Sequence, residues 1–267
     1  MAYKKTPMKF IRVFYRIQRG AVRVLTIPFR GLKEGGFKTS LRKTILTMQH
    51  SLPTEFVVNK GDVVVQVGTP RPRTMRRFLR AIGPAGKLII VEAMPENQDR
   101  LAAAISEGGI TNVLLLRGAA SNQNGIGELL ISPYQGDHKI DVENVVMDND
   151  LKPGNDYKER VSVKFFKLDD ELPRNGIHKI DYISITVNGA EAEVLRGASE
   201  LLKKCDHGTR VYAKGHALDA DKNPIHLLTQ SIMISNGYET KITRGEPSST
   251  RNTAWLWRAG DLYAWKT

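Results

Sequence analysis

Short apolar runs alternate with segments of helical periodicity along most of this chain. The first run, residues 63–67, is rich in β-branched valines and stops at Gly68. After a Gly-Pro break, a second apolar run at residues 88–91 ends in Glu92. Between the two runs, apolar residues recur three and four positions apart, at Met75, Phe78, Leu79 and Ile82. The pattern predicts a buried strand, a tight turn, an amphipathic helix and a second buried strand.

This order of strand, glycine turn, helix, strand and acid is typical of a nucleotide-binding βαβ unit. Glycine has no Cβ, so the backbone at Gly68 can approach a ligand closely. The carboxylate of Glu92, at the end of the second strand, can accept hydrogen bonds from two ribose hydroxyls. We therefore predict that the rest of the chain is organised around residues 61–97.

The alternation of strands and helices continues toward the C-terminus. Further strands are predicted at residues 112–116, 161–168, 180–187, 210–213 and 238–242. Further helices are predicted at residues 98–106, 189–202 and 224–236. Residues 122–160, rich in Asn, Gly, Asp and Pro, predict a hairpin with an irregular insertion that faces substrate. Together these elements predict an α/β domain with a mostly parallel sheet and helices on both faces.

Composition places the chain among soluble globular proteins. Its 267 residues are 41% apolar and 25% charged, and no apolar run approaches the length of a membrane span. The one cysteine, Cys205, excludes an internal disulfide and a cysteine-based zinc site, and is expected to be a buried thiol in a reducing compartment. We therefore expect a cytoplasmic protein, with a peripheral membrane association and organelle targeting left open.

The positive charge is concentrated at the N-terminus. The net charge is +12, and residues 1–33 contain nine Lys or Arg and no acid. Residues 34–60 add four bases against two acids, so the remainder of the chain is nearly neutral. A nucleic-acid groove spread over the main domain is therefore not expected. We predict two parts, a basic helical extension at residues 1–55 and the α/β domain at residues 56–267.

The basic extension has an amphipathic pattern. Apolar residues recur at helical spacing, at Phe10, Val13, Phe14, Ile17, Ala21, Val24 and Leu25. Arginines recur on the opposite face, at Arg12, Arg16, Arg19 and Arg23. The pattern predicts a helix that either packs on the domain or lies, through residues 8–27, on an anionic membrane or a protein partner. A transit peptide is a third interpretation, although the first 39 residues contain no serine.

Five stretches carry a resemblance to a known family. They are GDVVVQVG at 61–68, VEAMPEN at 91–97, the strand from 112 to 120, LDDEL at 168–172, and IDYISITVNGAEAEVLRGASELL at 180–202. In order and spacing they resemble the FkbM-type methyltransferase family, over more than half of the chain. The resemblance implies a Rossmann-like fold that binds S-adenosyl-L-methionine (SAM). It further implies O-methyl transfer to a small-molecule or glycan acceptor, such as the hydroxyl of a sugar or a lipid-linked glycan.

The resemblance also implies a set of site residues. Those that would bind the cofactor are Gln66, Gly68, Thr69, Glu92, Ala93 and Ala119. Glu191 would orient a hydroxyl or act as a weak general base, or it is simply an acid favoured at a helix N-terminus. His216 would take the hydroxyl proton, unless it is structural. The other histidines lack the mutual spacing of metal ligands, and no metal site is predicted.

Three stretches depart from the family pattern. Where the family resembles D-V-G-A-N-x-G, this chain has Gln66 in place of the acid and Pro72 in place of the last glycine. In the D-V-E-G-x-E stretch two acids are replaced, and only Glu191 remains. Lys214 stands where an acid precedes the histidine. These departures motivate an alternative hypothesis, a degenerate methyltransferase fold that serves as a docking subunit. An arginine lodged beside Glu92 would favour it, because a sulfonium is repelled by like charge.

Overall fold

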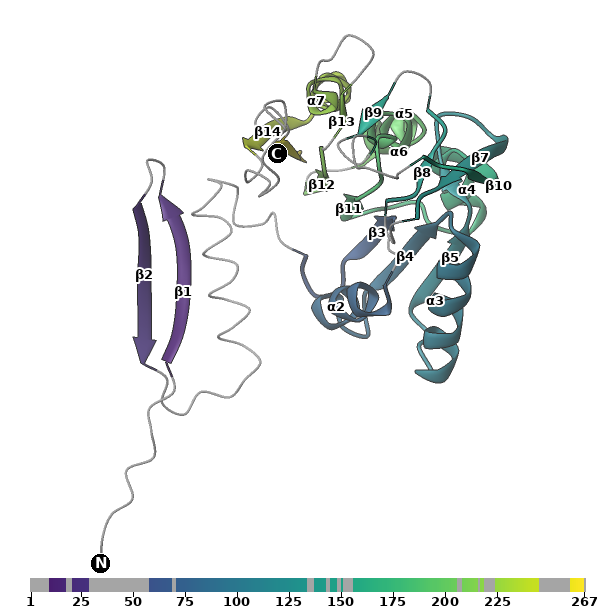
Figure 1. The fold of residues 1–267 in the computed structure, drawn as a ribbon. Coiled ribbons are helices and arrows are strands. Elements are labelled where there is room, and N and C mark those ends of the chain that lie inside the picture. The colour runs from purple at the N-terminus through teal and green to yellow at the C-terminus, as the bar shows by residue number, and fades with distance from the viewer. Residues whose placement is uncertain are drawn as a thin grey trace, which may run out of the picture. The chain divides into compact units, whose positions relative to one another are not determined.

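The computed structural model describes residues 10–17, 21–28, 58–68, 71–133, 137–142, 145–147, 150, 156–205, 208–215, 217–218, 224–244 and 260–266 (Figure 1). The chain separates into two compact units, Met1–Val57 and Val58–Thr267. Among the described residues, no helix is both long enough and apolar enough to cross a membrane.

The first unit contains a β-hairpin where the sequence predicts a helix. Strands β1 (Phe10–Ile17) and β2 (Ala21–Pro28) pair antiparallel, with Phe10 opposite Pro28 and Ile17 opposite Ala21. The predicted helix was therefore wrong. Both stretches are dense in β-branched and aromatic residues, which favour strands, and the short connection between them contains a glycine. Contact of residues 8–27 with a membrane or a protein stays a prediction, but it no longer rests on a helix.

The second unit is built on a seven-stranded sheet. Its strand order is β14-β15-β12-β11-β3-β4-β5. Five strands run parallel: β3 (Val63–Val67), β4 (Lys87–Glu92), β5 (Val113–Arg117), β11 (Tyr182–Ile185) and β12 (Arg210–Ala213). Strand β15 (Gly260–Trp265) is antiparallel to both of its neighbours, β12 and β14 (Glu239–Arg244). The predicted mostly parallel sheet is confirmed.

Helices cover both faces of this sheet. Helices α2 (Pro72–Ile82) and α3 (Pro95–Glu107) pack on one face, where Val64, Leu88 and Ile90 point. The alternate residues, such as Val65 and Ile89, point to the other face. That face is covered by α4 (Leu168–Arg174), α5 (Glu191–Arg196), α6 (Ser199–Lys204) and α7 (Ile225–Ser235). Figure 1 shows α2 and α3 below the sheet and α5 to α7 above it.

The structure splits the predicted helix at residues 189–202 into α5 and α6. The break falls at Gly197, whose N–H still bonds to the carbonyl of Glu193. A Cβ at Gly197 would lie only 1.9 Å from the carbonyl oxygen of Ser121. The glycine therefore allows a close backbone approach, which competes with a continuous helix.

A smaller sheet stands beside the carboxyl end of β5. Its order is β6-β10-β7-β8, with β6 (Ala119–Ala120), β10 (Glu159–Phe166), β7 (Gly125–Ile131) and β8 (Lys139–Ile140). A short pair, β9 (Val146–Met147) with β13 (Ala217–Leu218), lies outside both sheets. The strand predicted at residues 161–168 thus exists as β10, but in the smaller sheet. The predicted hairpin and insertion supply β7, β8 and β9.

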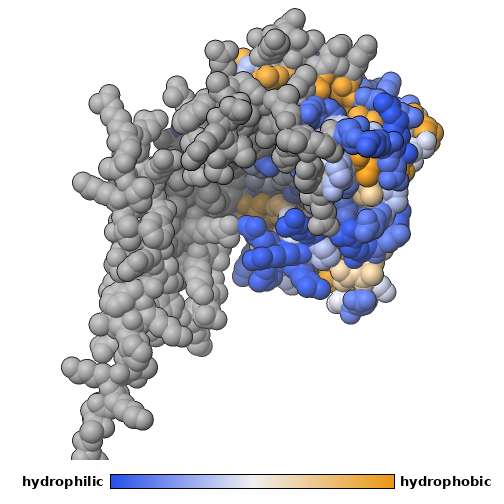
Figure 2. All heavy atoms as spheres, viewed as in Figure 1, coloured by the Kyte–Doolittle hydropathy of each residue, from blue (hydrophilic) through white to orange (hydrophobic). Residues whose placement is uncertain are grey.

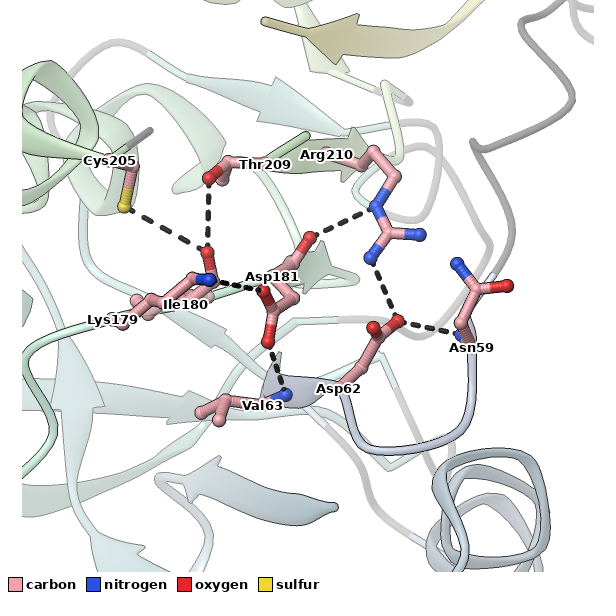
Figure 3. A network of polar contacts seen from close by, with 9 residues as sticks. All are labelled: Asn59, Asp62, Val63, Lys179, Ile180, Asp181, Cys205, Thr209 and Arg210. Carbon is pink, nitrogen blue, oxygen red and sulfur yellow. Dashed lines mark hydrogen bonds and ion pairs between the residues drawn. The ribbon is translucent and has the colours of Figure 1, made fainter. Parts of the chain in front are cut away.

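A buried polar network ties together the amino ends of three central strands (Figure 3). Arg210 at the start of β12 donates to Asp62 Oδ2 at 2.8 Å and to the carbonyl of Asp181 at 3.1 Å. Asp181 Oδ2 in turn accepts the backbone N–H of Val63 at 2.8 Å. Nearby Cys205 is buried, as predicted, with its thiol 3.9 Å from the carbonyl of Ile180. The network fixes the amino end of the sheet, opposite the edge where the site lies.

Candidate functional site

A cleft opens at the carboxyl ends of β3, β4, β5 and β11. It is lined by Val67, Gly68, Val91, Glu92, Ala93, Met94, Asn97, Gly118, Ala119, Ala120, Leu129, His138, Lys139, Ile140, Thr186, Val187, Asn188 and Ala190. The chain after β3 leads to β4 on one side, whereas β11 flanks β3 on the other. Such a switch in strand order is where α/β sheets bind ligands. The structure thus brings together four of the predicted cofactor residues: Gly68, Glu92, Ala93 and Ala119.

Two glycines in the lining of the cleft allow close backbone packing there. Gly68 has φ +76°, and a Cβ there would lie 2.7 Å from the carbonyl oxygen of Thr186. Gly118 has φ +135°, and its Cβ would lie 2.5 Å from the carbonyl oxygen of Lys164. Neither position accepts a side chain without moving backbone. Ala93 and Ala119 also line the cleft, where each adds only a methyl group.

Glu92 is held rigidly at the end of β4. Its residue is 6% exposed, and Oε1 accepts the backbone N–H of Met94 at 2.8 Å. Gln98, one turn into α3, donates to the carbonyls of Glu92 and Ala93 at 2.8 and 3.0 Å. These bonds fix the turn that presents the carboxylate. A pre-oriented acceptor at this position suits a pair of ribose hydroxyls.

Gln66 lies behind the cleft and is not part of its lining. Its Nε2 donates to Thr186 Oγ1 at 2.9 Å and contacts the carbonyls of Val67 and Gly68 at 3.2 and 3.3 Å. Thr186 Oγ1 donates to the Gly68 carbonyl at 2.5 Å. Gln66 and Thr186 occupy two of the positions where the family pattern has acids. A neutral hydrogen-bonded pair therefore holds the ends of β3 and β11 together in this chain.

Glu191 opens α5 immediately after Ala190, which lines the cleft. Its residue is 0% exposed, and neither carboxyl oxygen has a hydrogen-bond partner. Burial raises the pKa of Glu191 to about 8, and the repulsion of Glu193 adds to the shift. The backbone N–H groups of Gly189 and Glu191 lower this pKa, although neither forms a hydrogen bond of ordinary geometry with the carboxyl group. The carboxyl is thus a buried, protonated group just behind the cleft wall.

Four polar lining residues were missed by sequence reasoning: Asn97, His138, Lys139 and Asn188. His138 Nδ1 accepts the backbone N–H of Ser132 at 3.1 Å, so the proton of the neutral ring lies on Nε2. Burial lowers the pKa of His138, which keeps the ring neutral. Asn188 donates to the carbonyl of His138 at 2.8 Å and links the two walls. The prediction of substrate-facing loops covers His138 and Lys139, whereas Asn97 and Asn188 lie in stretches that carry the family resemblance but were given no role.

Lys139 brings a cation to the same wall, but an acid compensates it. Its Nζ lies 2.8 Å from Asp150 Oδ2, and the hydroxyl of Tyr157 donates to Asp150 Oδ1 at 2.7 Å. The ammonium also stands 5.1 Å from the centre of the Tyr157 ring. The three side chains therefore brace β8, which closes one side of the cleft.

The remaining predicted residues are placed as follows. Thr69 and His216 lie outside the described residues. Arg71 and Arg73 are exposed and do not line the cleft, so neither is lodged beside Glu92. Pro72 is the first residue of α2, a position where a missing N–H costs little. Within the described ranges, no group of three or more His, Cys, Asp or Glu could hold a metal ion.

The fold and the cleft define an α/β nucleotide-binding protein of Rossmann-like fold. Residues 62–240 match the family model described as the methyltransferase FkbM domain. The chain therefore belongs to the FkbM methyltransferase domain family, and it is a SAM-dependent methyltransferase.

Individual relatives are more distant. The 2-O-methyltransferase NoeI of Sinorhizobium fredii (strain NBRC 101917 / NGR234) is 28% identical over 179 residues, which cover 63% of this chain and 70% of NoeI. Among solved structures, fibrillarin of Aeropyrum pernix is 14% identical, covering 97% of this chain and 100% of its own, at a TM-score of 0.49. An O-methyltransferase from Bacillus cereus is 10% identical, covering 89% and 83%, at a TM-score of 0.47.

Proposed function

We propose that this methyltransferase transfers a methyl group from SAM to a hydroxyl of a sugar or a lipid-linked glycan. The observation that carries the proposal is the open cleft beside Glu92, which is lined by Gly68 and, among the described residues, by no arginine. An electronegative wall suits a cationic sulfonium cofactor, whereas an arginine there would repel it. The same observation counts against the alternative of a non-catalytic docking subunit. The relative NoeI is a 2-O-methyltransferase by name, which supports oxygen as the acceptor atom.

In this proposal the two ends of the cleft have different tasks. Glu92 accepts hydrogen bonds from the ribose hydroxyls, and the small residues Gly68, Ala93 and Ala119 admit the flat nucleoside. Gln66 does not touch the cofactor but positions the Gly68 backbone through Thr186. When bound, SAM supplies an electrophilic methyl on sulfur, which an oxygen attacks in line as the S–C bond breaks.

The acceptor side is formed by polar groups that suit a polyol. His138 presents a donor at Nε2, and the amides of Asn97 and Asn188 can both donate and accept. Such groups recognise hydroxyls without requiring charge on the acceptor. The attacking hydroxyl must lose its proton as the O–C bond forms. Glu191 is the proposed acceptor of that proton in its ionised form, which becomes more populated as the pH approaches its raised pKa of about 8 and is then a stronger base than an ordinary carboxylate.

The test is a methyl-transfer assay with SAM labelled on its methyl group and a panel of oligosaccharides and lipid-linked glycans. We expect label in an acceptor fraction that withstands mild alkali, because methyl ethers survive conditions that hydrolyse methyl esters. Glu92→Ala should lose the signal, and Glu107→Ala, which changes an exposed acid at the end of α3, should keep it. Label confined to alkali-labile esters would contradict hydroxyl transfer while leaving methyl transfer intact.

A further inference from the structure

The most exposed residues of helix α2 are all arginines. Of its eleven residues, four are exposed, and all four are arginines: Arg73, Arg76, Arg77 and Arg80. Arg71, just before the helix, is exposed as well. The apolar residues Met75 and Ile82 are buried on the opposite side, against the sheet. We call the four exposed side chains the α2 arginine face.

The α2 arginine face is narrow and continuous. At about 100° per residue, its four positions fall within an arc of roughly 100°, and they extend over roughly 10 Å along the axis. The positions are spaced three and four residues apart, so the guanidinium groups are neighbours. Figure 2 shows the surface over α2, at the lower left of the coloured part, as uniformly hydrophilic.

No acid neutralises these arginines within the described part of the chain. None of them forms an ion pair there, and α2 has no acid in its first turn. The neighbouring helix α3 is different, because its Arg100 pairs with Glu96 at 2.7 Å. Like charges three and four residues apart destabilise a helix, and cations near its N-terminus oppose the dipole. Four such charges therefore lower the stability of α2, in a unit that is otherwise nearly neutral. Their presence points to a ligand that they bind.

The chemistry of the face selects among anionic partners. A single-stranded nucleic acid needs aromatic side chains on which bases stack, usually along a basic groove. The α2 arginine face has no aromatic residue, and it is the outer surface of a helix. A protein interface has an apolar centre, whereas the large apolar residues of α2 are buried or partly buried and pack against the sheet. What remains is a dense row of guanidinium groups, which bind phosphates by paired hydrogen bonds.

We infer that the α2 arginine face docks this protein on an anionic membrane surface through lipid phosphates. The attraction is electrostatic and acts at the membrane surface, so no apolar helix has to insert into the bilayer. The start of α2 follows directly on the β3 turn at the cleft, so docking would bring the cleft close to lipid-borne molecules. The inference does not depend on the proposed acceptor or on methyl transfer.

The test is co-sedimentation of the full chain with phosphatidylcholine vesicles, with and without phosphatidylglycerol, in the absence of SAM. The variant Arg73→Gln/Arg76→Gln/Arg77→Gln/Arg80→Gln removes four charges from α2. A matched control removes four exposed arginines elsewhere: Arg100→Gln, Arg160→Gln, Arg174→Gln and Arg196→Gln. We expect the α2 variant to bind anionic vesicles more than roughly tenfold more weakly than the control variant. Added salt should weaken wild-type binding, and neutral vesicles should not bind.

Two further variants and two competitors complete the design. Arg-to-Lys changes at the four α2 positions keep the charge and should keep most of the binding. The pair Arg76→Gln/Arg80→Gln serves if the fourfold variant loses its thermal unfolding transition, and it should show a smaller loss of the same kind. Equal losses in the α2 and control variants would overturn the inference. So would tighter binding of a single-stranded RNA or of polyglutamate than of anionic vesicles, since either identifies another partner.

Discussion

At the scale of single residues, the pair formed by Gln66 and Thr186 explains how this chain departs from its family pattern. The amide of Gln66 donates to Thr186 and faces the carbonyls of Val67 and Gly68. Two of the three oxygens that this amide nitrogen contacts are carbonyls, which cannot donate, so a hydrogen-bond donor is needed at this point. At these two positions a matched neutral pair replaces the acids of the pattern and keeps the Gly68 turn in place.

We predict that Gln66→Glu destabilises the fold. The carboxylate is nearly isosteric but cannot donate, so it would face two carbonyl oxygens while buried. We expect the free energy of unfolding to fall by about 2–3 kcal/mol, measured by urea denaturation. The exposed change Gln123→Glu adds the same charge and should cost less than about 0.5 kcal/mol. Equal effects of the two variants would show that the hydrogen bonds of Gln66 are not needed.

Glu191 predicts a pH dependence of stability. Its pKa is raised by burial from 4.5 to about 8, so between these values the folded state holds a proton that the unfolded state releases. Stability from this group is therefore full below pH 4.5 and is lost as pH rises toward 8. The slope should approach about 1.4 kcal/mol per pH unit. Glu191→Gln, always neutral, should remove this slope from urea titrations at several pH values.

The same variant tests the proposed role of Glu191 in proton transfer. If the carboxylate accepts the proton, kcat/KM of the wild type rises with pH up to about 8, and Glu191→Gln loses that limb. A variant with an altered stability slope but an unchanged pH–rate profile would leave Glu191 a purely structural residue.

At the scale of elements, the network at the amino ends of β3, β11 and β12 predicts a large loss of stability when its buried ion pair is broken. The side chains of Arg210 and Asp62 are only 6% and 11% exposed, so losing one partner leaves the other charge buried. Asp62→Ala should lower the free energy of unfolding by about 3–5 kcal/mol in urea titrations. Glu200→Ala breaks the exposed pair with Lys203 and should cost at most about 1 kcal/mol. Similar losses of stability in Asp62→Ala and Glu200→Ala would show that burial does not increase the contribution of the Asp62–Arg210 pair.

Elements buried against the sheet could be predicted from their pattern, and those defined by local or distant partners could not. The runs that form β3, β4 and β11 are apolar because both of their faces are covered. In contrast, the β1–β2 segment fits helical and strand periods alike, and its β-branched residues decide for strands. The split at Gly197 depends on the carbonyl of Ser121, which is distant in sequence. No local pattern encodes such a contact.

The residues of the candidate site likewise divide into those that the local pattern predicts and those that distant contacts place. Gly68 and Glu92 end strands, and strand ends at a switch point meet in any fold of this class, so they were predicted. His138 and Lys139 reach the cleft on β8, inside an irregular insertion whose course depends on the Asp150 and Tyr157 contacts. Gln66 was assigned to the cofactor from its place in the motif. The structure shows that its amide turns toward β11 instead.

At the scale of the whole molecule, the cleft belongs to the second unit alone. All of its lining residues fall between positions 67 and 190. We predict that residues 58–267, produced separately, unfold in one cooperative transition and bind SAM as tightly as the full chain. Calorimetry and thermal denaturation of both proteins provide the measurement. A loss of affinity of more than roughly tenfold on removing residues 1–57 would contradict this autonomy.

The central claim is that the cleft beside Glu92 binds SAM, and calorimetric titration with SAM and S-adenosylhomocysteine tests it most directly. We predict micromolar binding of both ligands by the wild type. Glu92→Ala should weaken binding by about 100-fold or more, because two hydrogen bonds to a charged acceptor are lost. Glu107→Ala should bind like the wild type. The absence of heat and of a thermal shift at millimolar ligand, in protein that unfolds cooperatively, would contradict the claim.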